Sequence, residues 1–145
     1  MIHVRQKFKH CFVACCASAL EQNIIADQEA IVARFPTELQ NGTPDEGVPN
    51  TSKEVFVVVI GLGLSLNPNI LFSTGSSYSG VTDFLRANRQ HAERMMIFTK
   101  HPTNHCLRIR EIRDDGLTIM NPELHDFSPM TWQEFEATLP AILLL

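Results

Sequence analysis

The three residues Asp114-Asp115-Gly116 place the strongest constraint on how this chain folds. Before them, Cys106 to Ile112 alternates between apolar and charged side chains, and after them Leu117 to Met120 is apolar and ends at Asn121-Pro122. An Asp-Gly step between two such segments is typical of a tight hairpin. We therefore predict a pair of antiparallel strands here, with Met95 to Thr99 as a further short strand.

The first half of the chain has the pattern of helices rather than strands. Cys11 to Glu21 is rich in small apolar residues, and a second helix is expected from a cap at Asp27 to Pro36. Gly and Pro residues mark Leu39 to Asn50 as a loop. A fourth helix is expected over Ser79 to Gln90.

Two further helices begin at capping boxes. Thr51 followed by Glu54 favours a helix from Ser52 to about Ile60, although the β-branched run from Val57 to Ile60 would also suit a strand. Thr131 followed by Glu134 starts a last helix, predicted to contain Trp132, Phe135 and Leu139. Helices first and an antiparallel sheet second define the α+β class.

The length and charge of the chain limit what it can be. It has 145 residues, which is one domain's worth, so we predict a single domain over 1–145. Lys and Arg number 12 and Asp and Glu number 16, for a formal net charge of -4. This balance argues against nucleic acid as a partner, because phosphate binding needs a basic face. The longest apolar run, Val55 to Leu66, is shorter than the roughly 20 residues of a membrane helix.

Cysteine usage indicates a reducing environment. Cys11, Cys15 and Cys16 crowd together, with only Cys106 elsewhere, which is a poor arrangement for a disulfide framework. We therefore expect a cytoplasmic protein, and delivery to another cell as an effector stays open. The short apolar part from Cys11 to Ala14 contains no Leu, so a cleaved signal peptide is not expected.

Four residues supply the groups that a catalytic thiol needs. Cys11 lies where a polar segment meets the first apolar helix, so the field of the helix N-terminus favours its partial ionisation near neutral pH. His105 begins one hairpin strand and Asn121 ends the other, so Asn121 can hold the imidazole that receives the thiol proton. Gln6 can present an amide to the developing oxyanion.

These residues resemble the papain-like cysteine peptidases, in which Gln, Cys, His and then Asn or Asp follow in this order. The closer likeness is to the compact bacterial branch that includes the double-glycine leader peptidases of bacteriocin exporters. It covers nearly the whole chain and rests on a cysteine-led small-residue helix, a histidine-led strand, a hairpin ending in an Asx-Pro step and an aromatic helix, namely 11–15, 104–109, 115–122 and 132–135.

The resemblance implies a fold and an activity. The fold would be papain-like, with a helical N-terminal half packed on a C-terminal antiparallel sheet and an active cleft between them. The activity would be that of a thiol acyl-transfer hydrolase, most simply a peptidase that cleaves a peptide or isopeptide bond in a peptide or protein substrate. Cys11 would be the nucleophile, His105 the proton carrier, Asn121 its orienting partner and Gln6 the oxyanion donor, with no cofactor. The oligomeric state is not predicted.

Other interpretations stay open. The same residues could deamidate glutamine or transfer an acyl group, because the second nucleophile decides the fate of the acyl-enzyme. The chain could also be an inactive papain-like binding module, since four residues separate Gln6 from Cys11 where the family usually has five. Cys15 is a rival nucleophile one turn inside the helix. A zinc site at His101, His105 and Cys106 is disfavoured because recognisable ligand spacing is absent.

Overall fold

A computed structural model describes residues 1–6, 10–21, 28–35, 52–72 and 78–145. In chain order its elements are α1 Cys11–Ala19, α2 Gln28–Val32, α4 Ser52–Gly61, β1 Asn69–Phe72, α5 Tyr78–Ala87, a 3-10 helix η2 Arg89–Arg94, β2 Met95–Thr99, β3 His105–Ile112, β4 Gly116–Met120, β5 Ser128–Thr131, α6 Trp132–Ala137 and β6 Ala141–Leu144. The α+β class predicted from the sequence is confirmed: N-terminal helices pack on an antiparallel sheet formed mainly by the C-terminal half.

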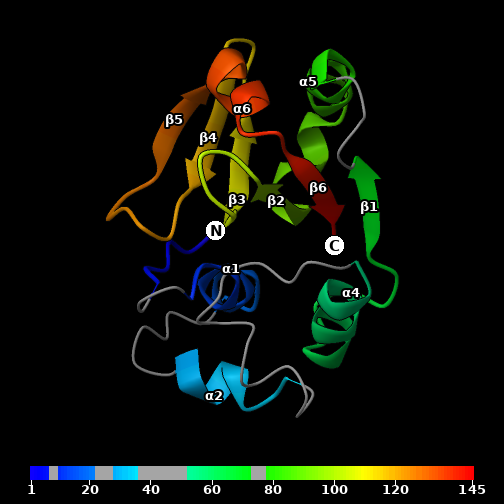
Figure 1. The fold of residues 1–145 in the computed structure, drawn as a ribbon, viewed down its shortest axis with the longest axis vertical. Helices are drawn as coiled ribbons and strands as arrows, with labels where there is room; N and C mark the ends of the chain where they lie inside the picture. The colour runs from blue at the N-terminus through cyan, green and yellow to red at the C-terminus, as the bar shows by residue number, and fades with distance from the viewer. Residues whose placement is uncertain (7–9, 22–27, 36–51, 73–77) are drawn as a thin grey trace.

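The sheet has six strands in the order β1-β6-β2-β3-β4-β5, and every neighbouring pair is antiparallel. Helices α1, α2 and α4 lie on one side of it, and α5 and α6 lie on the other (Figure 1). Among the described residues, no helix is long and apolar enough to cross a membrane.

The two sides of the sheet contribute to two separate hydrophobic cores. We call the side covered by α1, α2 and α4 the sulfur face; its strands contribute Met96, Phe98, Cys106, Met120 and Leu143 to the core. We call the side covered by α5 and α6 the aliphatic face; its strands contribute Met95, Ile97, Leu107, Ile109, Ile112, Leu117, Ile119 and Ile142. Because successive residues of a strand point to opposite faces, the central strands must be apolar at nearly every position.

The β-branched run in α4 is helical because its burial follows the period of a helix. Val55, Val58, Val59 and Leu62 are buried, whereas Val57 is exposed. Positions spaced by three and four residues share one side of a helix, and here that side packs into the core beside α1. The predicted helix is confirmed and the alternative strand is wrong. Thr51, and with it the predicted capping box, lies outside the described residues, as do Asp27 and the loop Leu39 to Asn50.

The hairpin forms as predicted, with Arg113 N–H donating to the Gly116 carbonyl at 2.8 Å. Glycine is required at 116 because its φ is +157° and because a side chain there would collide with the Met130 carbonyl and the Thr131 backbone. The capping box at Thr131 and Glu134 is also confirmed.

Three strands were not predicted: β1, β5 and β6. The predicted last helix was too long, because α6 ends at Ala137 and Leu139 lies beyond it with a φ of 52°. The predicted fourth helix is divided into α5 and η2. The first helix ends at Ala19 rather than Glu21.

Candidate functional site

His105 and Asn121 form the hydrogen bond that the hairpin predicts. The His105 Nε2 atom lies 2.8 Å from Asn121 Oδ1, and both side chains are half-buried. The backbone N–H of Glu123 donates to the same Oδ1 atom at 3.0 Å. Because the Glu123 N–H can only donate, the Asn121 atom that it contacts must be the amide oxygen, and an amide oxygen only accepts hydrogen bonds. The imidazole therefore donates its Nε2–H, and the neutral ring carries its lone pair on Nδ1.

The hairpin register accounts for this contact. At the open end of the hairpin, the outermost pair of opposite residues is Arg108 of β3 and Met120 of β4. One step further along, Asn121 comes opposite Leu107, so His105 is its diagonal neighbour two positions away. Diagonal neighbours of an antiparallel pair lie within reach of long side chains. The residues are thus brought together across the end of the hairpin rather than directly opposite each other.

Cys11 is the first residue of α1, as predicted. His10, which precedes it, provides no side-chain cap, so the first-turn backbone N–H groups need other acceptors. The Cys11 sulfur is placed to accept from the backbone N–H groups of Cys11 and Phe12 and from that of Cys106 on β3. Since Cys106 directly follows His105, the thiol lies against the same end of β3 that carries the imidazole.

The predicted ionisation of Cys11 is wrong for this structure. Its side chain is only 3% exposed, and burial raises the pKa of the thiol from 9.0 to about 12. The nearby Cys15 thiol adds to the increase in pKa, whereas the three backbone N–H groups oppose it. Loss of hydration disfavours the thiolate more than the helix N-terminus stabilises it. The free protein therefore holds Cys11 as a neutral thiol at pH 7.

Gln6 lies beside the Asn121-Pro122 step. Its backbone N–H donates to the Pro122 carbonyl at 2.8 Å, and its side chain is half-buried. Residues 7–9, which join it to α1, lie outside the described residues. The structure thus brings the Gln6 backbone to the strand end that carries Asn121.

The other three cysteines are buried free thiols, in keeping with their interpretation as small apolar residues. Burial raises the pKa of Cys16 and Cys106 well above the ordinary value. The nearby Cys15 thiol adds to the increase in the pKa of Cys106, so α1 and β3 are in contact behind Cys11.

Sequence reasoning missed the buried cation on this face. Arg108 is 5% exposed, and it donates from Nη1 to Ser18 Oγ at 2.8 Å and from Nη2 to the Glu93 carbonyl at 2.6 Å. Burial lowers the pKa of its guanidinium. An Arg in an alternating strand is normally solvent-facing, so nothing in the local pattern distinguished it. Arg108 ties α1 and η2 to the middle of the sheet.

Two histidines near the N-terminus are removed from solvent to different degrees: His10 is buried and His3 is half-buried. Within the described ranges, no group of three or more His, Cys, Asp or Glu side chains could hold a metal ion. Comparison with protein-family models and with the curated proteins found no match for this chain.

Proposed function

We propose that this chain is a cysteine-dependent acyl-transfer hydrolase with a papain-like arrangement, most simply a peptidase that cleaves a peptide or isopeptide bond. The observation that carries the proposal is the 2.8 Å bond between His105 Nε2 and Asn121 Oδ1 at the strand end where the Cys11 sulfur also lies. Thiol acyl transfer requires a histidine that is held in a fixed orientation and can reach the thiol, and the bond to Asn121 supplies that orientation.

His105 acts as the general base in this proposal. Because its Nε2–H is held by Asn121, its Nδ1 is the atom free to take a proton. Cys11 is neutral at pH 7, so the S–H proton passes to Nδ1 as the sulfur attacks the substrate carbonyl. The carbon–nitrogen bond then breaks, the departing amine takes the proton from the imidazolium, and water hydrolyses the thioester.

The oxyanion that forms during attack needs hydrogen-bond donors. The first-turn N–H groups of Cys11 and Phe12 are not capped by the His10 side chain and lie next to the sulfur, and the Gln6 amide is the further donor. The substrate reaches the sulfur between α1 and the sheet. Delivery of a carbonyl to this position requires the 3% exposed Cys11 to become more accessible when the substrate binds.

The buried Cys11 also favours a second candidate, a papain-like binding module without activity. A thiol with a pKa of about 12 and little exposed surface is typical of a structural cysteine. Deamidation of glutamine and acyl transfer use the same site and differ only in the leaving group or second nucleophile. For each of these functions we propose that the partner is a peptide or a protein. We also propose that the protein acts in the cytoplasm, either of its own cell or of another cell to which it is delivered as an effector, because four free thiols suit a reducing compartment.

Acylation by a small activated ester tests the proposal without a known substrate. The folded chain is incubated with 4-nitrophenyl acetate at pH 7, and peptide mass spectrometry identifies the acetylated residue. We expect Cys11 to be modified ahead of Cys15, Cys16 and Cys106. His105→Ala is expected to slow this by a factor of about 10² to 10⁴, the usual contribution of a general base.

Matched variants separate catalysis from damage to the fold. His91→Ala removes a histidine in η2, a helix that supplies no residue to the candidate site, and is expected to leave the rate unchanged. Asn121→Ala is expected to slow acylation less than His105→Ala, because the base remains but is no longer oriented. Equal acylation rates in the wild-type and His105→Ala chains, or no Cys11 acylation at all, would overturn the enzyme proposal in favour of the binding module.

A further inference from the structure

The first six residues of the chain, which we call the N-terminal segment, are hydrogen-bonded at two points. Ser18 Oγ of α1 donates to the Ile2 carbonyl at 2.5 Å, and Gln6 N–H donates to the Pro122 carbonyl at 2.8 Å. Between these two bonds, the fully buried Val4 side chain belongs to the same hydrophobic core as α1. The N-terminal segment is therefore attached both to α1 and to the connection that follows β4.

The Ser18 hydroxyl that holds the N-terminal segment is itself held by a buried cation. Arg108 of β3 donates from Nη1 to Ser18 Oγ at 2.8 Å, and the two residues are 5% and 0% exposed. The hydroxyl thus accepts from the guanidinium and donates to the Ile2 carbonyl. A hydrogen bond from a charged donor is stronger than one between neutral groups, and it strengthens the next bond in the chain. Arg108, Ser18 and Ile2 therefore form one continuous chain of hydrogen bonds.

This chain of bonds joins the three elements that carry the candidate catalytic groups. Strand β3 begins with His105, α1 begins with Cys11, and the N-terminal segment reaches Gln6. The bond donated by the guanidinium links β3 to α1, and the bond donated by the hydroxyl links α1 to the N-terminal segment. Ser18 lies about two turns after Cys11 in the same helix, so a bond that fixes Ser18 also fixes the level of Cys11 along β3.

Apolar packing by itself does not define that level. Most buried residues of α1 are small, such as Ala14 and Ala17, and contacts between apolar surfaces are non-directional. A buried ionic hydrogen bond, by contrast, is satisfied at one register of the two elements only, which is the best-attested role of such groups. The guanidinium cannot follow a shifted helix, because its Nη2 atom also donates to the Glu93 carbonyl of η2 at 2.6 Å.

We propose that Ser18, held by Arg108, is a positioning residue: it fixes the level of Cys11 relative to His105 and holds the segment that carries Gln6. The inference deepens the proposed function and rests on it, because the placement of these groups matters only if the thiol is acylated. The hydrogen bonds themselves can be tested without catalysis. Removal of the hydroxyl is expected to release the N-terminal segment and to let α1 shift along β3.

Amide hydrogen exchange on the full chain, followed by NMR, tests the first of these effects without an activity measurement. The Gln6 N–H is the reporter, because its bond to the Pro122 carbonyl closes the held segment. Ser18→Ala is expected to make this proton exchange about fivefold faster, the change to which the loss of one hydrogen bond corresponds. Acylation of Cys11 by 4-nitrophenyl acetate is expected to slow by up to about 10²-fold, because a displacement of about 1 Å can cost that much.

Thr82→Val is the matched control for the loss of a buried hydroxyl. Thr82 is 6% exposed, and its Oγ1 donates to Glu136 Oε1 at 2.7 Å, so this variant breaks a comparable bond between α5 and α6. It is expected to lower the free energy of unfolding but to change neither Gln6 exchange nor Cys11 acylation. Ser18→Thr keeps the hydroxyl and is expected to return both rates toward the wild-type values, which a role in packing alone would not do.

A second variant keeps the test decisive if Ser18→Ala does not fold. Arg108→Met combined with Ser18→Ala replaces the buried polar pair by apolar groups, a change that is often neutral for stability, and is expected to change both rates in the same way. Unchanged acylation of Cys11 in either folded chain, or equal changes in Thr82→Val, would overturn the proposal. Absence of Cys11 acylation in the wild-type chain would overturn the proposed function instead, and unchanged Gln6 exchange would then overturn the holding role of Ser18 as well.

Discussion

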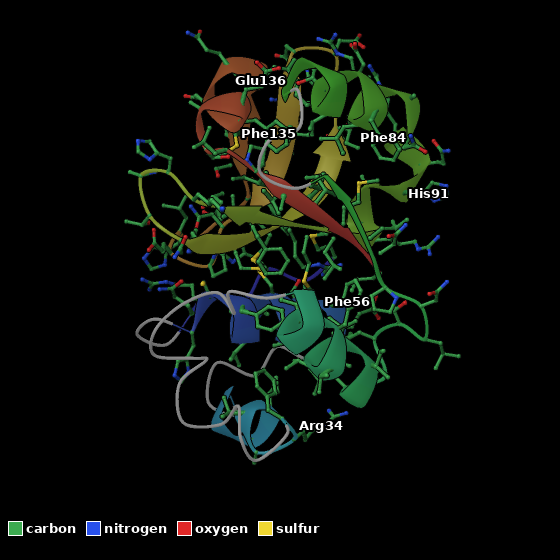
Figure 2. All side chains as sticks on the ribbon, turned by 45° about the vertical axis from the view of Figure 1, so that its right-hand side comes forward. Arg34, Phe56, Phe84, His91, Phe135 and Glu136 are labelled. Carbon is green, nitrogen blue, oxygen red and sulfur yellow. The ribbon has the colours of Figure 1, made fainter. Side chains whose placement is uncertain are left out.

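The sulfur face and the aliphatic face of the sheet are equally well buried but differ in chemistry. The core on the aliphatic face consists of Val, Ile and Leu side chains together with Ala92, Met95 and Phe135, and every one of these is apolar. The sulfur face holds all four cysteines and the buried guanidinium of Arg108 (Figure 2 shows side chains on both faces). The buried thiols and the buried guanidinium thus lie on the same side of the sheet.

This difference separates stability from reactivity. Apolar burial on the aliphatic face stabilises the fold without dependence on pH. On the sulfur face, burial works against the ionisation of each thiol, so packing and chemistry are linked there. The difference predicts that mutations on the aliphatic face change only the free energy of unfolding, whereas mutations on the sulfur face also change how Cys11 reacts.

The largest expected effect is on the aliphatic face. Phe135 is the fully buried residue of α6, and Phe135→Ala leaves a cavity in its place. The expected cost is about 3–5 kcal/mol in the free energy of unfolding. Urea unfolding measures it. Leu66→Ala, at a side chain that is 92% exposed, is the control and is expected to change stability little. A cost as small as that of the control would show that this face does not carry the stability of the fold.

Alkaline pH should weaken the sulfur face. Cys11 has a pKa raised to about 12 in the folded state, against 9.0 for an ordinary thiol, and Cys16 and Cys106 are raised well above 9.0. Above pH 9 the unfolded chain loses these protons while the folded chain keeps them, so stability is complete below pH 9 and falls as pH rises toward 12. Each thiol contributes up to about 1.4 kcal/mol per pH unit.

Urea unfolding between pH 8 and pH 11 checks this prediction. Cys106→Ala removes one of the thiols and is expected to give a shallower decline than the wild-type chain. Phe135→Ala lowers stability at every pH and should leave the slope unchanged. A decline of equal steepness in the Cys106→Ala chain would show that groups other than the buried thiols control alkaline unfolding.

Much of the fold could be predicted because local signals and tertiary packing agree. The hairpin follows from Asp115-Gly116, and the start of α6 follows from Thr131 and Glu134. The strands β1, β5 and β6 were missed because nothing local defines them. Ala141–Leu144 is simply apolar, and it becomes a strand because the sheet offers it backbone partners on both sides, β1 and β2.

The bond between His105 and Asn121 was predictable from the sequence, whereas the electrostatics of Cys11 was not. The spacing of His105 and Asn121 around a hairpin was enough to predict their hydrogen bond. The pKa of Cys11 depends on how deeply α1 packs against β3 and on Cys15 behind it, and neither can be read from a position at a helix N-terminus. The contact between the rings of His3 and Phe127 joins residues more than a hundred positions apart in the chain, so no local pattern could predict it either.

Loss of a helix cap on the aliphatic side should have a smaller effect. Thr131→Ala removes the hydroxyl that accepts from Glu134 N–H at 3.1 Å, at an expected cost of about 1 kcal/mol in stability. Thermal unfolding measures it, and Glu134→Gln is the milder control because an amide oxygen can still accept from Thr131 N–H. Acylation of Cys11 is expected to be unchanged in both chains. A slower acylation rate would show that the two faces are coupled through the sheet.

The smallest effect expected is a change in the pKa of Cys11. Cys15 raises that pKa, so Cys15→Ala should lower it and increase the thiolate fraction at pH 8. Alkylation of Cys11 by iodoacetamide, followed by peptide mass spectrometry, should become faster by less than about tenfold, the equivalent of one pKa unit. Cys16→Ala is the matched control: it removes the adjacent thiol, whose effect on the pKa of Cys11 is smaller than that of Cys15. Equal acceleration in both variants would point to loosened packing of α1 rather than to charge. Acceleration in Cys15→Ala alone would show that the neighbouring thiol keeps Cys11 protonated in the free protein.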